Sequence, residues 1–467
     1  MPDSQTFDAV VLGAGPGGYV AAIRLAQLGK SVALIEEKYW GGVCLNVGCI
    51  PTKALLKNAE VASLVTTEAA HYGIGGEITV DYSAAFNRSR QVSEGRVKGI
   101  HYLTKKNGIT EFEGRGTFLS ANSISVATAS GDVVINFTNA IIAAGASPRQ
   151  IPGIAFTERV VNYEQQILSQ ELPKSIVIVG AGPIGVEFAF VMSSYGTEVT
   201  IVEAQDRALP LEDADTSKEI AKLLRSKKIN LLTGASLTGI DETTDAVTVN
   251  LNLANGEAKQ LVAEKAMIAI GFGANVTGYG LENTGVELAP NKTIQVNSHL
   301  QTNVSSIYAI GDVTGKMQLA HVAEHQGVVA AETIAGAEPA GIDDYRAMPR
   351  AIFTTPQVAS FGPTEEQARA ENAELLVSKF SMVANGKAHA LGVPTGFVKL
   401  IADAGTRKLI GAHIVAADAS ELIAELTLAS SAGVSIDDMN HNVHIHPTLS
   451  EGIQEAIHGL VGEMINA

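Results

Sequence analysis

The chain has 467 residues, which is too long for one ordinary core, so two to four domains are expected. Its net charge of -16 argues against nucleic acid as the main partner, because phosphate binding requires a basic surface. Residues 1–8 do not have the pattern of a secretory signal, no apolar run reaches the ~18 residues that a membrane helix requires, and the cysteines are too few for a secreted disulfide framework. We therefore expect a cytoplasmic protein without a nucleic-acid or membrane partner.

The first predicted element is a strand that runs into a glycine turn, and the same pattern returns later in the chain. Residues 9–18 read AVVLGAGPGG, and residues 175–185 read SIVIVGAGPIG. Each copy continues through a helix-length segment into a second apolar strand that ends in an acid, at residues 32–36 and 199–203. This order is typical of a βαβ dinucleotide-binding unit. The repeat therefore predicts two dinucleotide sites.

Each copy has three glycines and one acid with separate physical roles. The first glycine makes the tight turn, the second lets a pyrophosphate approach the backbone, and the third lets the helix pack on the strand. The acid accepts a hydrogen bond from a ribose hydroxyl. The candidates are Gly13, Gly15, Gly18 and Glu36 in the first copy, and Gly180, Gly182, Gly185 and Glu203 in the second. The Glu203 carboxylate repels a 2′-phosphate, which favours NAD over NADP, although Arg207 lies nearby in the sequence.

Both cysteines lie in residues 41–53, GGVCLNVGCIPTK. As a structural disulfide the pair would close a very short loop in a reducing compartment and would contribute little. As a metal site it lacks a second cysteine pair or a nearby histidine. A redox pair fits best, because Pro51 is a good first helical residue, which places Cys49 at a helix N-terminus where the dipole and Lys53 favour a thiolate. We therefore interpret Cys44 and Cys49 as a redox pair.

The remaining segments indicate the domain organisation. Residues 117–137 alternate as short strands do, and residues 146–150 look like a loop between domains. From about residue 348, strand-like runs such as 397–401 and 409–415 alternate with helical ones, which is typical of an α+β domain. We expect an α/β fold with two Rossmann-like dinucleotide-binding domains followed by a C-terminal α+β domain.

Residues 44–53, CLNVGCIPTK, placed after a dinucleotide fold, resemble the flavin disulfide reductases, and most closely the dihydrolipoamide dehydrogenase branch of that family. The resemblance covers essentially the whole chain and includes residues 308–312, YAIGD, and 444–451, HIHPTLSE. It implies FAD in the first nucleotide site and NAD in the second. It also implies that Cys44 faces substrate and Cys49 faces the flavin. The boundaries that we predict are 1–148 for an FAD-binding domain, 149–272 for an NAD-binding domain, 273–346 for a central domain that completes the FAD site, and 347–467 for a dimerisation domain.

The same resemblance assigns further cofactor contacts. Asp312 matches an aspartate that binds the ribityl and phosphate part of FAD, and Gly116 and Ala320 match backbone contacts to FAD. Lys53 matches a lysine beside the flavin, paired with a glutamate that would be Glu187. Gly271 belongs to the predicted NAD site. It begins the loop GFGAN at residues 271–275, which lacks the arginines common in that family.

The segment TLSE at residues 448–451 can be interpreted in two ways. It has the form of a capping box, in which Glu451 would only cap a helix and His446 would be a turn residue. The resemblance instead makes His446 and Glu451 a catalytic dyad, donated by the partner subunit of a homodimer, in which the histidine deprotonates a substrate thiol and the glutamate orients it. We interpret His444 as structural.

The function implied by the resemblance is oxidation of the dihydrolipoyl arm of a 2-oxoacid dehydrogenase acyltransferase with reduction of NAD⁺. A glutathione-type disulfide reductase of the same family is the alternative, and it would be expected to carry basic residues in place of Glu203. A flavin-binding interaction protein without catalysis is a further alternative. The presence of both cysteines together with His446 and Glu451 argues against it.

Overall fold

The structure is a computed structural model and describes residues 3–371 and 374–466. The chain forms two compact units, and each is assembled from three stretches of sequence. The first unit comprises Met1–Ala54, Ala84–Arg149 and Gly271–Tyr345, and the second comprises Leu55–Ser83, Gln150–Ile270 and Arg346–Ala467. The finer division into four domains stays a prediction.

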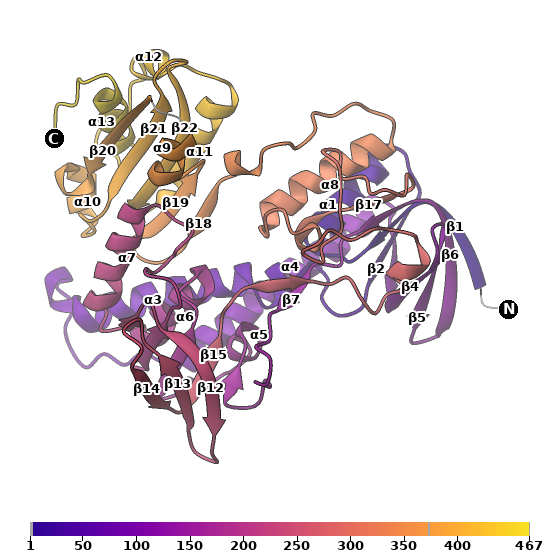
Figure 1. The fold of residues 1–467 in the computed structure, drawn as a ribbon, viewed down its shortest axis with the longest axis horizontal. Helices are drawn as coiled ribbons and strands as arrows, with labels where there is room; N and C mark the ends of the chain where they lie inside the picture. Colours follow the sequence, from indigo (N-terminus) through magenta and orange to yellow (C-terminus); the bar gives the residue numbers. More distant parts are fainter. Residues whose placement is uncertain (1–2, 372–373, 467) are drawn as a thin grey trace. The chain divides into compact units, whose positions relative to one another are not determined.

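The first unit is built on a seven-stranded sheet in the order β3-β2-β1-β6-β5-β4, with β17 paired to β6 (Figure 1). Strands β3, β2, β1, β6 and β17 run parallel, whereas β4 and β5 pair antiparallel with their neighbours. The bounds are β1 Asp3–Leu12, β2 Val32–Glu36, β3 Thr110–Glu113, β4 Arg115–Ser120, β5 Ser123–Thr128, β6 Gly131–Ile142 and β17 Ile307–Ala309. A two-stranded sheet joins β7 (Ala146–Pro148) to β16 (Phe272–Ala274).

Helix α1 (Pro16–Gln27) follows the first glycine turn and packs against α8 (Ala320–Ile334), as Figure 1 shows. Strands that the sequence pattern predicted supply the apolar core of this unit. The buried core residues include Val10, Ile35, Phe118, Ile135 and Ile142. The predicted order of strand, glycine turn, helix and strand is confirmed for residues 9–36.

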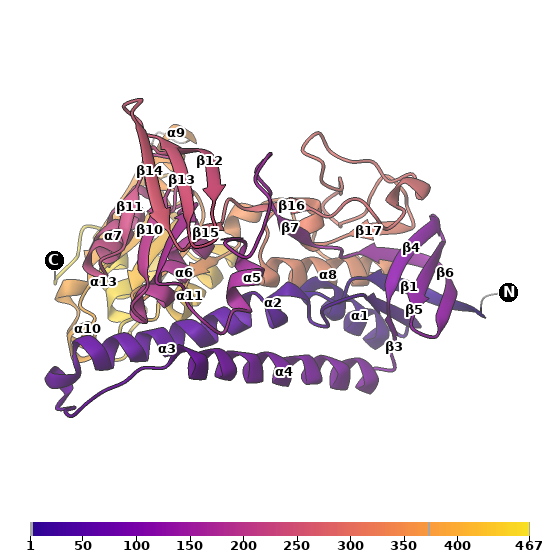
Figure 2. The same cartoon turned by 90° about the horizontal axis from the view of Figure 1, so that it is seen from below.

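The second unit contains the other nucleotide-binding pattern on a five-stranded parallel sheet in the order β11-β10-β9-β15-β8. A three-stranded antiparallel sheet, β12-β13-β14, belongs to the same unit (Figure 2). The bounds are β8 Val160–Val161, β9 Ser175–Val179, α6 Pro183–Ser194, β10 Glu198–Val202, α7 Ala214–Ser226, β11 Asn230–Leu232, β12 Ser236–Glu242, β13 Val247–Asn252, β14 Ala258–Ala263 and β15 Lys265–Ile268. The second copy of the repeat therefore folds as the first does.

The C-terminal part of the second unit is an antiparallel sheet in the order β18-β19-β22-β21-β20. Helices α11 and α13 pack on one face of this sheet and form its core with Phe361, Val398 and Ile414. The predicted α+β pattern is confirmed. The bounds are β18 Arg350–Ile352, β19 Gln357–Phe361, β20 Leu375–Ser381, β21 Phe397–Asp403, β22 Lys408–Ala416, α11 Ala419–Ser431 and α13 Glu451–Leu460.

The other helices are shorter connections or run alongside these sheets. They are α2 Gly42–Asn46, α3 Cys49–Thr67, α4 Tyr82–Lys106, α5 Tyr163–Ile167, α9 Glu365–Glu371, α10 Gly386–Ala390 and α12 Ile436–Met439. Over residues 3–371 and 374–466, no helix combines the length and the apolar character that crossing a membrane would require.

Candidate redox and nucleotide-binding sites

The two glycine loops have the same backbone geometry. The Gly13 N–H donates to Ile35 O at 2.8 Å, and the Gly180 N–H donates to Val202 O at 2.8 Å. Both glycines have positive φ angles, 103° and 112°. A Cβ at either position would lie 2.3 Å from a carbonyl oxygen of the neighbouring strand end. Only glycine fits these two turns.

The other glycines of each loop have different reasons to lack a side chain. A Cβ at Gly18 or Gly185 would lie 1.9 or 2.0 Å from the oxygen of the first glycine of its loop, so these positions allow the helix to start against the strand. Gly15 and Gly182 are the N-caps of α1 and α6, and neither helix start has a side-chain cap. The first amides of both helices are therefore open to an anion such as a pyrophosphate.

The acids that end the second strands are also placed identically. Glu36 accepts the Ala14 N–H at 2.8 Å, and Glu203 accepts the Ala181 N–H at 2.8 Å. The second oxygen of Glu203 accepts the Gln205 N–H, and that of Glu36 accepts two amides of its own turn. Each carboxylate thus fixes the residue after the first glycine, a role that the sequence interpretation missed. An ionised carboxyl has about four acceptor sites, so each keeps capacity for a ribose hydroxyl.

The other predicted FAD contacts fit the group in the first unit. Asp312 lies in the turn Gly311–Thr314, and burial raises the pKa of its carboxyl to about 6. This carboxyl has no hydrogen-bond partner within residues 3–371 and 374–466, as expected of a group that binds a ligand hydroxyl. Ala320 is the first residue of α8, whose start has no side-chain cap. Gly116 lies in β4, where a Cβ would touch Leu12 at 2.7 Å, so packing alone gives a reason for this glycine.

The redox segment folds as two helices joined by a tight turn. Cys44 lies in α2 and Cys49 is the first residue of α3, so the helix starts two residues before the Pro51 start predicted from sequence. The start moves because the Gly48 carbonyl accepts both the amide and the hydroxyl of Thr52. A Cβ at Gly48 would lie 3.2 Å from the Cys44 Cα and 2.9 Å from Val43 O. Glycine here lets the chain return against the first cysteine.

The redox segment also lies against the first nucleotide loop. The Gly41 N–H donates to Ala14 O at 2.9 Å. A Cβ at Gly42 would lie 2.6 Å from the Gly15 Cα, so the two backbones touch. A dinucleotide held by this loop therefore binds beside the cysteines, which agrees with a cofactor that exchanges electrons with them.

Cys44 and Cys49 contact each other as thiols, without a disulfide bond. The hydrogen bond with Cys49 raises the pKa of the Cys44 thiol, burial raises it further, and the charge of a Cys49 thiolate adds to the rise. These surroundings favour the protonated form of Cys44. Tyr19 and Glu324 lie nearby: the Tyr19 hydroxyl donates to Glu324 at 3.4 Å, and the Glu324 charge also raises the pKa of Cys44.

Arg90 and Asn46 hold this segment in place, and the sequence interpretation did not single out either residue. Arg90 on α4 donates to Asn46 O at 2.7 Å. The Asn46 amide in turn donates to Trp40 O and Gly42 O, each at 2.9 Å. No local signal identifies Arg90, because it lies 44 positions from Asn46 in the sequence.

His446 and Glu451 are brought together in the second unit. The His446 Nδ1 lies 2.8 Å from one Glu451 oxygen, and the other oxygen accepts the Thr448 N–H at 2.8 Å. The predicted capping box is wrong in detail, because Glu451 is the first residue of α13 and the N-cap Ser450 makes no side-chain cap. Although burial raises the pKa of Glu451, the Thr448 amide and the His446 ring lower it overall. The His446 side chain is 80% exposed, so the ring is accessible to a substrate thiol.

His444 makes a separate contact, with Glu425 on α11 at 3.0 Å. Its side chain is almost fully buried, and Glu425 also binds Asn442. These contacts fit the structural role that we assigned to His444.

The structure places three further predicted cofactor residues, whose roles, like those of the other site residues, stay predictions. Glu187 is buried on α6 and accepts the Phe353 N–H at 2.9 Å. Lys53 lies in the first turns of α3 and belongs to the first unit. Gly271 also belongs to the first unit, where its carbonyl accepts the Arg149 N–H at 2.9 Å. The pairing of Lys53 with Glu187 and the contact of Gly271 with NAD remain predictions.

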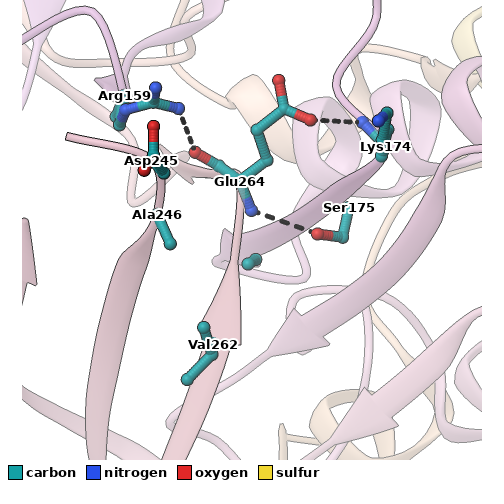
Figure 3. Close-up of a pocket in the computed structure, with 8 residues that line it drawn as sticks. Arg159, Lys174, Ser175, Asp245, Ala246, Val262 and Glu264 are labelled. Atoms are coloured by element: carbon teal, nitrogen blue, oxygen red, sulfur yellow. Dashed lines mark hydrogen bonds between the residues drawn. The ribbon is translucent and has the colours of Figure 1, made fainter. Parts of the chain in front are cut away.

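A surface pocket in the second unit is lined by Arg159, Ser175 and Glu264, among others (Figure 3). It lies at the start of β9, at the opposite end of this strand from the glycine loop. Ser175, at the start of β9, accepts the Glu264 N–H at 3.1 Å, whereas Gly180 follows the end of β9. Arg159 donates to Glu264 O, and the Glu264 carboxylate accepts the Lys174 N–H. Nucleotides bind at the carboxyl ends of parallel strands, so this pocket is not the cofactor site.

Comparison with known proteins assigns the family. Residues 7–327 match the family described as pyridine nucleotide-disulphide oxidoreductase, and residues 348–457 match its dimerisation domain. The chain belongs to the pyridine nucleotide-disulphide oxidoreductase family. The predicted family and fold class are thereby confirmed.

Several characterised members of the pyridine nucleotide-disulphide oxidoreductase family are similar over almost their full length. Dihydrolipoyl dehydrogenase of Mycobacterium tuberculosis (strain ATCC 25618 / H37Rv) is 56% identical over 461 residues, which cover 98% of this chain and 99% of the relative. Dihydrolipoyl dehydrogenase of Corynebacterium glutamicum is 51% identical over 467 residues, which cover 99% of this chain and all of the relative.

Solved structures have the same fold. The crystal structure of LpdA from Mycobacterium tuberculosis matches with a TM-score of 0.90 at 26% identity, covering 98% of this chain and 99% of that chain. The HOCl-induced flavoprotein disulfide reductase RclA from Escherichia coli matches with a TM-score of 0.86 at 29% identity, covering 96% of this chain and 99% of that chain.

Proposed function

We propose that this chain is a dihydrolipoyl dehydrogenase that uses FAD, NAD⁺ and the Cys44–Cys49 pair. The observation that carries the proposal is the contact between two thiols whose backbone lies against a dinucleotide loop. The second nucleotide loop and the exposed His446 held by Glu451 supply the other parts that dithiol oxidation requires. Relatives at 51% and 56% identity carry the name dihydrolipoyl dehydrogenase.

The cofactors would be held by the two equivalent loops. FAD would lie on the first loop, with Glu36 at its ribose and Asp312, Gly116 and Ala320 along its length. Lys53, paired with Glu187, would lie beside the flavin. NAD⁺ would lie on the second loop, with Glu203 at its ribose and Gly271 as a further contact. Bound FAD would supply an acceptor for the electron pair of the reduced cysteines and a hydride donor for NAD⁺. Glu203 already accepts two backbone amides and would repel a 2′-phosphate, which supports NAD⁺ over NADP⁺.

The cysteines would carry out two thiol–disulfide exchanges. A substrate thiolate attacks Cys44 of the oxidised pair, forming a mixed disulfide while the bond to Cys49 breaks and Cys49 leaves as a thiolate. The second substrate thiolate then attacks the substrate sulfur of that mixed disulfide, which closes the lipoyl ring and releases Cys44. The substrate dithiol is oxidised and the cysteine pair is reduced.

His446 would act as the base in both exchanges. Its ring accepts the proton of the attacking thiol at Nε2 while Glu451 holds Nδ1 and stabilises the imidazolium. The proton of the first thiol passes to solvent before the second exchange, and the imidazolium formed in the second exchange gives its proton to the released Cys44. We further propose that the dyad of one subunit serves the cysteines of its partner in a homodimer, so that a monomer would be inactive. The match of residues 348–457 to a dimerisation domain supports this arrangement.

We also propose that the natural substrate is the lipoyl arm of a 2-oxoacid dehydrogenase acyltransferase and that the enzyme works in the cytoplasm. A direct test compares dihydrolipoamide plus NAD⁺ with glutathione disulfide plus NADPH in steady-state assays of the purified, FAD-loaded protein. Turnover with the first pair only is the expected result. Turnover with the second pair only would instead identify a glutathione-type reductase.

A further inference from the structure

One residue from each strand of the C-terminal sheet forms a polar row across the sheet. The row consists of Lys379, Lys399, His413, Ser360 and Arg350, and each is the direct cross-strand neighbour of the next. Cross-strand neighbours share one face of a sheet. The residues beside them in the chain supply the apolar core under α11 and α13 on the other face. The polar row therefore lies on the face away from that core.

Four carboxylates complement the polar row. Lys399 lies 2.9 Å from Asp213, 3.1 Å from Asp215 and 2.6 Å from Glu365. Glu212 accepts Arg350 at 2.7 Å and the Ser360 hydroxyl at 2.6 Å. Lys379 also reaches Asp215, at 3.1 Å. Three of these carboxylates, at residues 212, 213 and 215, lie at the start of α7, in the nucleotide-binding part of the second unit.

Lys399 is the centre of this arrangement. Only 3% of it is exposed, and its ammonium contacts three carboxylates. A buried ion pair contributes little net stability, because desolvation offsets the Coulomb attraction, but removing one partner leaves an uncompensated charge. Although burial lowers the pKa of Lys399, its bonds with Glu365 and Asp213 raise it overall, so the ammonium persists across the physiological range. The contacts of Lys399 with the three carboxylates are thus better explained by fixing the position of α7 than by a gain in stability.

The carboxylates connect directly to the second glycine loop. The Glu212 N–H donates to Leu209 O at 2.9 Å, and the Leu209 N–H donates to Ala181 O at 2.9 Å. Ala181 lies between the first two glycines of that loop and also donates to Glu203. Leu209 has a φ of 50°, which is costly for a bulky residue, and it is 2% exposed. Such a conformation persists only if the surrounding residues hold it. Glu212 and Asp213, which begin three residues later, are held by the polar row and can fix it.

We propose that Lys399 is a positioning residue for the pyridine-nucleotide site, acting through Asp213 and the Leu209–Ala181 hydrogen bond. A lysine of the C-terminal sheet thereby sets the position of the loop amides that face the nucleotide. This inference rests on the proposed assignment of the second loop to NAD⁺. It predicts an effect on the nucleotide and none on the exchange between substrate and cysteines.

The test is Lys399→Met, which removes the charge and keeps the length of the side chain. The expected result is a rise in the KM for NAD⁺ of about tenfold or more, with an unchanged rate of cysteine reduction by dihydrolipoamide in the absence of NAD⁺. Lys399→Arg should recover most of the affinity. Lys379→Met is the matched control, because Lys379 lies at the same register but is partly exposed and does not contact Asp213. It should change the KM by less than about twofold.

Normal NAD⁺ affinity in folded Lys399→Met would overturn the proposal, as would an equal loss in both half-reactions. If this variant does not fold, Asp213→Asn keeps an N-cap residue on α7 and should raise the KM in the same direction. NAD⁺ binding measured by equilibrium dialysis separates this inference from the proposed function. A wild-type protein that binds NAD⁺ but does not oxidise dihydrolipoamide would contradict the proposed function but not this inference. Dialysis of the Lys399 variants would then still test whether Lys399 affects NAD⁺ binding.

Discussion

The two carboxylate oxygens of Glu451 have different partners, the His446 ring and the backbone of Thr448. One oxygen lies 2.8 Å from the His446 ring and the other accepts the Thr448 N–H at 2.8 Å. The contact with the backbone fixes the carboxylate, and the carboxylate then fixes the ring. The contact with Thr448 is one half of the predicted capping box, and the same carboxylate holds the ring that we propose as the base.

We expect Glu451→Gln to lower the rate of cysteine reduction by dihydrolipoamide by roughly tenfold to a hundredfold. The amide can still accept the Thr448 N–H, so the thermal unfolding midpoint should change little, but it cannot stabilise the imidazolium. Glu455→Gln is the control, because Glu455 lies on the same helix, α13, and accepts the backbone amides of residues 465 and 466 in place of the His446 ring. An unchanged rate in Glu451→Gln, measured by stopped-flow spectroscopy, would contradict the assigned role.

Cys44→Ser should retain FAD and lose turnover with dihydrolipoamide. Serine fills the same place in α2, so the contact of the segment with the glycine loop is kept, but the hydroxyl cannot form the mixed disulfide. The measurements are the flavin absorbance per chain and the steady-state rate. Dihydrolipoamide activity in this variant would show that the exchange thiol has been assigned wrongly.

Gly182→Ala should fold normally and bind NAD⁺ about tenfold more weakly. An added Cβ meets no atom within 4 Å in this structure, so the methyl group would occupy space that the pyrophosphate requires. Gly180→Ala should behave differently and lower the unfolding midpoint, because its Cβ would lie 2.3 Å from Ala269 O at a φ of 112°. Equal NAD⁺ affinity in Gly182→Ala and wild type would argue against a nucleotide at this loop.

Stability should fall as the pH is lowered from 7 to 5, and His413 should account for much of the slope. His413 is fully buried, donates from Nε2 to Pro363 O at 3.0 Å, and has no partner for Nδ1 among the residues that the structure describes. Burial lowers its pKa, against the opposing charges of Asp213 and Glu212 and with the help of Arg350. Below its unfolded pKa of about 6.5, the unfolded chain binds a proton that the folded chain does not, which favours unfolding.

The carboxylates that contact Lys399 do not change the stability between pH 7 and 5. The pKa values of Asp213, Asp215 and Glu365 are lowered in the fold, so their contribution to stability is lost only below their unfolded values of about 4. His413→Gln keeps a donor for Pro363 O and should flatten the dependence of the unfolding midpoint between pH 7 and 5. His441→Gln, at an exposed position, should not. An unchanged slope in His413→Gln would refute the assignment.

The parts of the site that could be predicted from sequence are those encoded over short distances. The spacing of Gly13, Gly15 and Gly18 before an acid-ended strand predicts one βαβ unit, and the repetition at Gly180 predicts the second. Pro51 is a strong helix-start signal, but α3 begins two residues earlier, because Thr52 donates to the Gly48 carbonyl across a turn that sequence pattern does not show.

The parts that could not be predicted depend on contacts between distant segments. Arg90 reaches Asn46 from another helix, and Lys399 meets Asp213 across 186 positions of sequence. A lysine inside the apolar run FVKLI gives no sign of its partners, because only the register of five strands aligns it with the other members of the polar row. Motifs can be found from sequence, but the residues that hold them in place cannot, because they lie far away in the chain.

The most direct test of the proposed function is anaerobic titration of the purified, FAD-containing protein with dihydrolipoamide, followed by addition of NAD⁺. We expect a long-wavelength absorbance band from a thiolate beside the flavin after reduction, and formation of NADH with loss of that band when NAD⁺ is added. Absence of bound flavin, or a flavin that dihydrolipoamide does not reduce, would contradict it.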